Sequence, residues 1–162
     1  MVADGLGHGP LAADASRTAE RLFAANDFTG PTEFLEQAHR ALGSTRGAAI
    51  SVAHGSAADR RVTFTGVGNV AGAVVGAEEH KNMVGHNGTI GATMPRVQTF
   101  DYDWPEHSLL VLNSDGLKTR WSIHGYPGLH ARHPAVVAGV LYRDFRRTND
   151  DVTVLVCRRT QS

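Results

Sequence analysis

The sequence predicts a fold of the α+β class, and three patterns along the chain indicate it. Apolar residues first recur at helical spacing, over residues 11–25 and 32–42. From residue 48 to residue 112 the apolar residues follow the spacing of strands, and the separators are rich in Gly, Ser, Ala and Asp. One more helical stretch and one apolar strand follow. This order differs from the regular βαβ alternation that builds a parallel sheet.

The first elements are a short strand, a glycine loop and two helices. Residues 2–9 form an apolar entry that runs into the loop. Pro10 suits the first turn of a helix, because the N–H that proline lacks has no helical partner there. We expect this helix over residues 11–25. Thr32 is expected to cap a second helix, which Gly43 ends.

The middle of the chain predicts a series of strands, followed by a helix and a last strand. The expected strands are 48–53, 61–66, 70–75, 82–86, 97–102 and 109–112. Residues 109–112 are apolar without a break, which is typical of a strand buried on both faces. Residues 134–145 have the apolar spacing of a helix, and residues 152–157 predict another buried strand.

Composition sets limits on the function. The chain has 162 residues, with 16 basic residues against 16 acidic ones, and this balance argues against nucleic-acid or anionic-membrane binding. Its one cysteine, Cys157, excludes an internal disulfide and a multi-cysteine metal site, and it is expected to be a core residue. Because the sequence shows neither a membrane-spanning run nor a signal peptide, we expect one cytoplasmic domain over residues 1–162.

Aspartates at the ends of apolar segments are the candidates for chemistry. Asp4 precedes Gly5, Asp115 follows the strand at 109–112, and Asp150 and Asp151 directly precede the last strand. A single aspartate at such a place often only caps a turn. On neighbouring core strands, however, these carboxylates could converge at one sheet edge, where they would repel unless a cation neutralised them. Oxygen ligands select hard ions such as Mg²⁺ or Mn²⁺.

Five segments, in order, resemble the motifs of PPM/PP2C-type protein serine/threonine phosphatases of the SpoIIE/RsbX group. They are residues 2–16 around Asp4-Gly5, 66–70 (GVGNV), 87–91 (NGTIG), 114–117 (SDGL) and 149–153 (NDDVT). The resemblance implies two stacked antiparallel β-sheets flanked by helices, an α-β-β-α sandwich. It also implies a binuclear Mn²⁺ or Mg²⁺ site at one end of the sandwich.

The resemblance further implies roles for single residues. As metal ligands and catalytic residues, Asp4 would bridge both ions, and Asp115 and Asp150 would complete the first. The Gly5 carbonyl would bind the second ion. Asp151 stands where many members have Asn, and is expected to support the ligands. A metal-activated water would then hydrolyse phosphoserine or phosphothreonine. The implied substrate is a phosphorylated STAS-domain or anti-sigma pathway protein of bacterial stress signalling.

The chain departs from the family pattern at its start. Members carry an acidic residue on the strand before the Asp-Gly motif, whereas none of the three residues before Asp4 is acidic. We therefore expect an N-terminally short domain without the first hairpin, which binds metal but has a weakened second site. The alternative is a catalytically weak or inactive PPM domain that binds a partner. A missing strand would also leave an open sheet edge, through which two copies could form a homodimer.

Two more residues are candidates for substrate contacts. His8 lies in the glycine loop and could touch phosphate or protonate the leaving serine, or it could merely cap the following helix. Arg120 is a candidate for phosphate binding, because arginine binds phosphate bidentately. Residues 7–12 also fit the G-x-G-x-x-A dinucleotide fingerprint, but the antiparallel pattern of the chain disfavours that function. The nine histidines include no H-E-x-x-H zinc motif.

Overall fold

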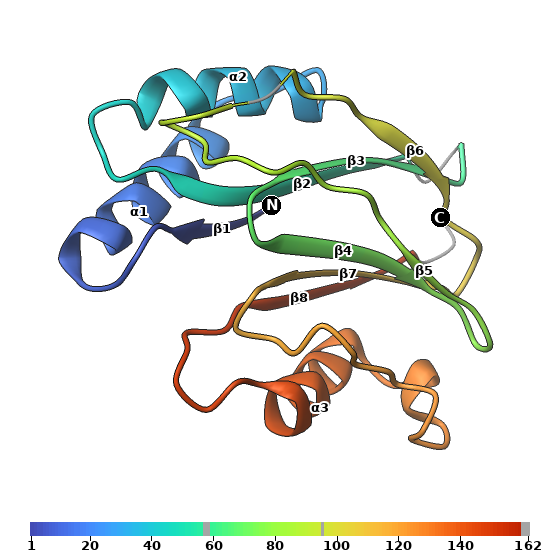
Figure 1. The fold of residues 1–162 in the computed structure, drawn as a ribbon. Helices are drawn as coiled ribbons and strands as arrows, with labels where there is room; N and C mark the ends of the chain where they lie inside the picture. The colour runs from blue at the N-terminus through green and yellow to red at the C-terminus, as the bar shows by residue number, and fades with distance from the viewer. Residues whose placement is uncertain (57–58, 95, 160–162) are drawn as a thin grey trace.

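A computed structural model of the protein describes residues 1–56, 59–94 and 96–159. Two four-stranded sheets lie face to face, and helices cover both outer faces (Figure 1). The helices α1 Pro10–Ala25 and α2 Pro31–Ala41 pack on the first sheet. The helix α3 Pro134–Phe145 and the short 3-10 helix η1 Leu129–Ala131 pack on the second. The expected α-β-β-α sandwich is thus confirmed.

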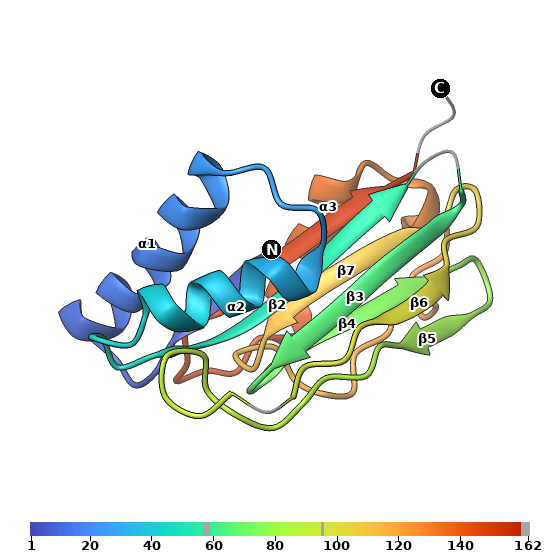
Figure 2. The same ribbon diagram turned by 90° about the horizontal axis from the view of Figure 1, so that it is seen from above.

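The strand order is β1-β2-β3-β6 in the first sheet and β5-β4-β7-β8 in the second. Their bounds are β1 Val2–Gly5, β2 Ala48–Ser56, β3 Arg61–Val67, β6 Phe100–Asp103, β5 His80–Asn82, β4 Val70–Val75, β7 Leu109–Ser114 and β8 Val154–Arg158. Every neighbouring pair of these strands is antiparallel. In the view from above, β3 and β4 run across the molecule one over the other (Figure 2). An antiparallel β1 rules out the dinucleotide-binding interpretation of residues 7–12, which needs a parallel sheet.

Two of the expected strands, at 82–86 and 97–102, are displaced along the chain in the structure, and contacts between distant residues explain their new ends. β5 ends at Asn82, because the Val84 N–H donates to the Tyr102 hydroxyl at 2.8 Å instead of to a strand. β6 begins only at Phe100, since the N–H of Gln98 donates to Nε2 of His86 at 3.2 Å.

The last strand, β8, begins at Val154 and is half-buried along its whole length, because it is the outer strand of its sheet. Cys157 is accordingly half-buried, and it packs at the margin of the core instead of within it. The last strand was expected at 152–157 and fully buried; the observed strand begins two residues later and is only half-buried.

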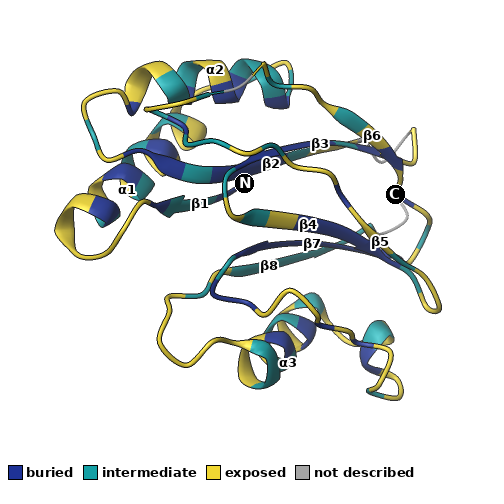
Figure 3. Ribbon diagram, in the orientation of Figure 1, coloured by how far each residue is buried: buried dark blue, intermediate teal, exposed yellow. Residues whose placement is uncertain are grey.

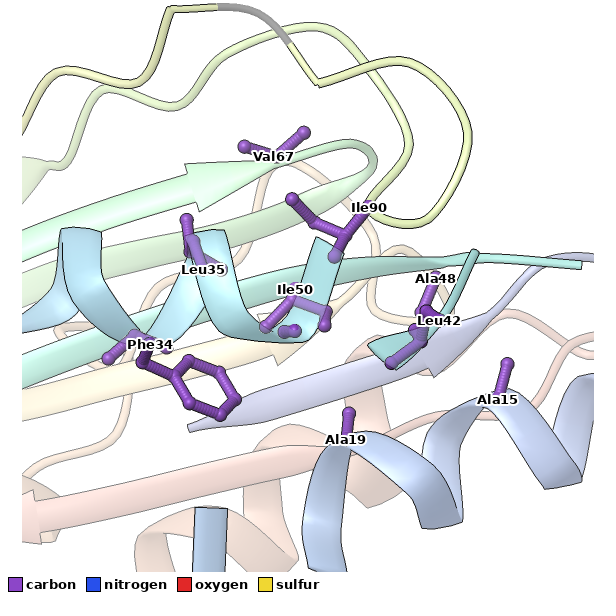
Figure 4. Close-up of a cluster of buried hydrophobic side chains, with 11 residues drawn as sticks. Ala15, Ala19, Phe34, Leu35, Leu42, Ala48, Ile50, Val67 and Ile90 are labelled. Carbon is purple, nitrogen blue, oxygen red and sulfur yellow. The ribbon is translucent and has the colours of Figure 1, made fainter. Parts of the chain in front are cut away.

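Three apolar layers hold the sandwich together. Phe64 and Leu112 are among the residues packed between the sheets. Phe34 and Ile50 belong to the layer between the first sheet and its helices, which Figure 4 shows in detail. β7 is buried on both faces, as its sequence predicts, and Figure 3 shows the buried strands in the middle with exposed turns around them. Among the described residues, no helix combines the length and the apolar character that crossing a membrane requires.

Gly5 sets the distance between β1 and α1. Its N–H donates to Oγ of Ser16 at 2.8 Å. A Cβ at this position would lie 1.9 Å from the carbonyl oxygen of Ala12, so only glycine permits this approach. The contact fixes the end of β1, where Asp4 lies.

Gly5→Ala should lower the free energy of unfolding by about 2–4 kcal/mol, because the added methyl group meets backbone that cannot move aside. Urea denaturation followed by circular dichroism measures this change. Gly139→Ala is the matched control: a Cβ there meets nothing within 4 Å. Since Gly139 lies inside α3, its substitution should raise stability by up to about 1 kcal/mol. Equal effects of the two substitutions would contradict the packing described for Gly5.

Candidate metal and phosphate site

A cleft opens at one end of the sandwich, where both sheets contribute turns. It is the end at the left of Figure 1, where β1 leads into α1, β3 leads into β4, and the chain approaches β8. The cleft has a volume of about 540 Å³, and it is lined by residues 4–8, 49, 68–69, 88–89, 115 and 148–151.

Both sheets bring carboxylates to this cleft. Asp4 lies at the end of β1 in the first sheet, and Asp115 directly follows β7 in the second. Burial raises the pKa of Asp4 to about 6, together with the negative charge of Asp115 and a side-chain hydrogen bond with it. The charges of Asp150 and Asp151 contribute further to this rise. These carboxylates are therefore close enough to Asp4 to disfavour its ionised form.

The turn after β7 and the segment before β8 are joined by hydrogen bonds. The Ser114 N–H donates to the Thr153 carbonyl at 3.1 Å, and the Thr153 N–H donates to Oγ of Ser114 at 3.0 Å. The Arg147 N–H donates to the Gly116 carbonyl at 2.7 Å. A Cβ on Gly116 would lie only 2.0 Å from the carbonyl oxygen of Asp151. This backbone contact holds the two aspartate segments in one arrangement.

Six of the seven residues predicted from the sequence line the cleft. They are Asp4, Gly5, His8, Asp115, Asp150 and Asp151. The seventh, Arg120, is exposed on the loop after β7 and is not among the described residues that line the cleft. The helix after His8 has Gly9 at its N-cap and no side-chain cap, so His8 does not cap it.

Four polar residues also line the cleft without having been singled out by the sequence. They are Asn69, Thr89, Thr148 and Asn149. Each lies in or beside one of the matched motifs, and Asn69 and Thr89 directly follow a glycine. A glycine turn lets the backbone, and with it the next side chain, come close to a ligand. A polar residue directly after a glycine is therefore the sequence feature that could have indicated Asn69 and Thr89.

The chemistry of the donors fits a hard divalent cation. The cleft offers carboxylates, the Gly5 carbonyl, and amide and hydroxyl oxygens, which Mg²⁺ and Mn²⁺ accept. A cation would also relieve the repulsion that raises the pKa of Asp4. Within the described ranges, no three His, Cys, Asp or Glu side chains converge closely enough to enclose an ion, and the pair in contact is Asp4 with Asp115.

Comparison with solved structures finds several similar proteins. A structure reported for the bacterial stressosome has a TM-score of 0.84 and 25% identity, over 96% of this chain and 82% of that chain. RsbX in complex with magnesium has a TM-score of 0.73 and 22% identity, over 95% and 77% of the two chains. The serine/threonine phosphatase PstP/Ppp of Mycobacterium tuberculosis has a TM-score of 0.75 and 16% identity, over 95% and 85%.

Comparison with curated proteins found no significant match. The family model described as stage II sporulation protein E (SpoIIE), however, matches residues 1–160, which is nearly the whole chain. Together with the fold, this match identifies the group that the sequence motifs indicated. The chain belongs to the SpoIIE family and has the fold of the PPM/PP2C-type protein phosphatases.

Proposed function

We propose that this domain is a metal-dependent phosphatase that hydrolyses phosphoserine or phosphothreonine in a protein substrate. The observation that carries the proposal is the meeting of Asp4 and Asp115, one from each sheet, in a cleft that Asp150 and Asp151 also line. Burial and mutual repulsion have raised the pKa of Asp4 to about 6, so the cluster favours a positive partner.

Asp4, the Gly5 carbonyl, Asp115 and Asp150 would hold Mn²⁺ or Mg²⁺. When bound, the ions would supply positive charge for the phosphoryl oxygens and would lower the pKa of a water, so that it can lose a proton at neutral pH and attack phosphorus as hydroxide. His8, on the glycine loop, would hydrogen-bond the phosphate or protonate the leaving serine oxygen. The proposed cations are supported by the structures of RsbX with magnesium and of PstP with two manganese ions.

The proposed substrate is a phosphorylated STAS-domain or anti-sigma pathway protein. Support comes from the settings of the similar structures, which include the bacterial stressosome and the RsbU and RsbW domains of Rv1364c from Mycobacterium tuberculosis. The neutral charge balance of the chain favours a protein over a nucleic acid as the partner.

A second candidate function is a regulatory PPM domain with weak or no catalysis, which binds a partner protein. One observation favours it: the described carboxylates do not enclose an ion as they stand. β1 and β8 are outer strands of their sheets, and a homodimer through either edge would suit this function. Analytical ultracentrifugation tests the dimer, and a monomer at micromolar concentration would exclude it.

Asp115→Asn and Asp150→Asn should each reduce Mn²⁺-dependent hydrolysis of a phosphoserine peptide by about 100-fold or more, because each removes a negative ligand. Release of inorganic phosphate, with Mn²⁺ and with EDTA, measures the effect. Asp14→Asn is the matched control, since Asp14 is exposed on α1 and lies outside the cleft.

Full activity of either cleft variant would refute the ligand assignment. If the unaltered chain shows no metal-dependent hydrolysis of any phosphopeptide, the second candidate function is favoured.

The raised pKa of Asp4 predicts how the stability of the metal-free protein depends on pH. The folded state binds a proton at Asp4 more tightly than the unfolded state does, so stability should fall as the pH rises from about 4 to 6. A shift of two pKa units is worth about 3 kcal/mol, and because Asp4 is only half-buried we expect about 1 kcal/mol.

Urea denaturation of the metal-free protein and of Asp4→Asn, over this pH range, measures the difference. The fall should be absent in the variant, and saturating Mn²⁺ or Mg²⁺ should stabilise the unaltered protein more at pH 7 than at pH 5. The same pH dependence in both proteins would show that Asp4 is not the titrating group.

A further inference from the structure

A second pocket opens beside the cleft, on the outer face of the second sheet, and the proposed chemistry uses only residues that this pocket shares with the cleft. We call it the side groove, and it is lined by residues 69–73, 82–83, 113–115, 117, 119, 121, 147 and 150. Its volume is about 480 Å³. Asn69, Asp115 and Asp150 line both the cleft and the side groove, so a ligand can extend from one into the other.

The side groove has an apolar floor and a polar rim. Leu117 and Trp121 are buried and belong to the apolar layer under α3, so they form a fixed surface. Asn113 is 5% exposed and donates from Nδ2 to the Ser114 carbonyl at 2.8 Å, while its Oδ1 has no hydrogen-bond partner among the described residues. An N–H donor entering the groove would complete the hydrogen bonding of this amide.

Arg147 is the basic residue in the lining of the side groove. Its side chain is exposed, and in the described part of the chain it makes neither a hydrogen bond nor an ion pair. Nearby arginines differ in this respect: Arg143 pairs with Asp144 at 2.6 Å, and the guanidinium of Arg146 lies 5.2 Å from the centre of the Tyr142 ring. The backbone of Arg147, by contrast, is fixed to Gly116.

We propose that the side groove binds the peptide segment next to the phosphorylated residue, and that Arg147 pairs with an acidic side chain of that segment. The inference rests on the proposed phosphatase function, because the phosphate is taken to lie in the cleft. An extended peptide advances about 3.3 Å per residue, so a residue one or two positions from the phosphoserine enters the groove. A backbone N–H of the peptide donates to Oδ1 of Asn113. The carboxylate of the acidic side chain pairs with the planar guanidinium of Arg147, which binds carboxylates through two parallel hydrogen bonds.

The test uses three fluorescent phosphoserine peptides that carry Glu, Gln or Lys at the positions one and two residues from the phosphoserine. KM and kcat are measured for the unaltered chain, Arg147→Ala, Arg147→Lys and the matched control Arg146→Ala. The Glu peptide should have the lowest KM. Arg147→Ala should raise that KM about fivefold, with the effect on KM and not on kcat. Arg147→Lys should restore part of the preference, and Arg146→Ala should leave it unchanged.

Fluorescence anisotropy with the same peptides measures binding without turnover, and hydrolysis of p-nitrophenyl phosphate tests the catalytic site without the groove. A preference for the Glu peptide in binding, lost in Arg147→Ala, supports the inference. If p-nitrophenyl phosphate is not hydrolysed, only the phosphatase function is refuted, and the binding result still supports the side groove. Equal binding of the Glu, Gln and Lys peptides overturns the inference. Equal effects of Arg146→Ala and Arg147→Ala overturn it as well. The general positive charge of these two arginines, and not the side groove, would then be responsible for the preference.

Discussion

The contact between Asp4 and Asp115 joins the two sheets at the end where the cleft lies. In water these carboxylates would separate, but β1 and β7 are held by apolar layers on both sides, and their ends cannot move apart. The packing of the sandwich therefore buries Asp4 and keeps negative charges beside it, and both effects raise the pKa of Asp4, burial more than the charges. Charges forced together in this way are characteristic of functional sites, where a ligand supplies the compensating charge.

The Asp-Gly pairs of the sequence have one physical explanation in both sheets. At Gly5 and at Gly116 the backbone approaches another carbonyl so closely that a Cβ would lie within about 2 Å of it. The aspartate of each pair supplies the charge, and the glycine lets the backbone of a neighbouring segment, Ala12 of α1 in one case and Asp151 in the other, pack directly against it. Both glycines are thus required for the packing around the two aspartates.

Local patterns in the sequence were sufficient for the class of fold, for the helix and strand order and for the aspartates. They failed where a distant partner decides the outcome. The ends of β5 and β6 depend on Tyr102 and His86, which are far away along the chain. Arg147 and Arg120 are a second example, because nothing in their sequence neighbourhoods tells which of them reaches a pocket. The tertiary structure places Arg147 in the lining of the side groove and leaves Arg120 outside the cleft.

The central claim is that the carboxylates from the two sheets form a cation site. Titration calorimetry with Mn²⁺ at pH 6, in buffers of different ionisation enthalpy, tests it most directly, because it measures binding and the release of protons together. The account predicts at least one Mn²⁺ per chain and the release of about half a proton from Asp4, which is near its pKa at this pH. Absence of binding, or binding and proton release that are unchanged in Asp4→Asn, would contradict it.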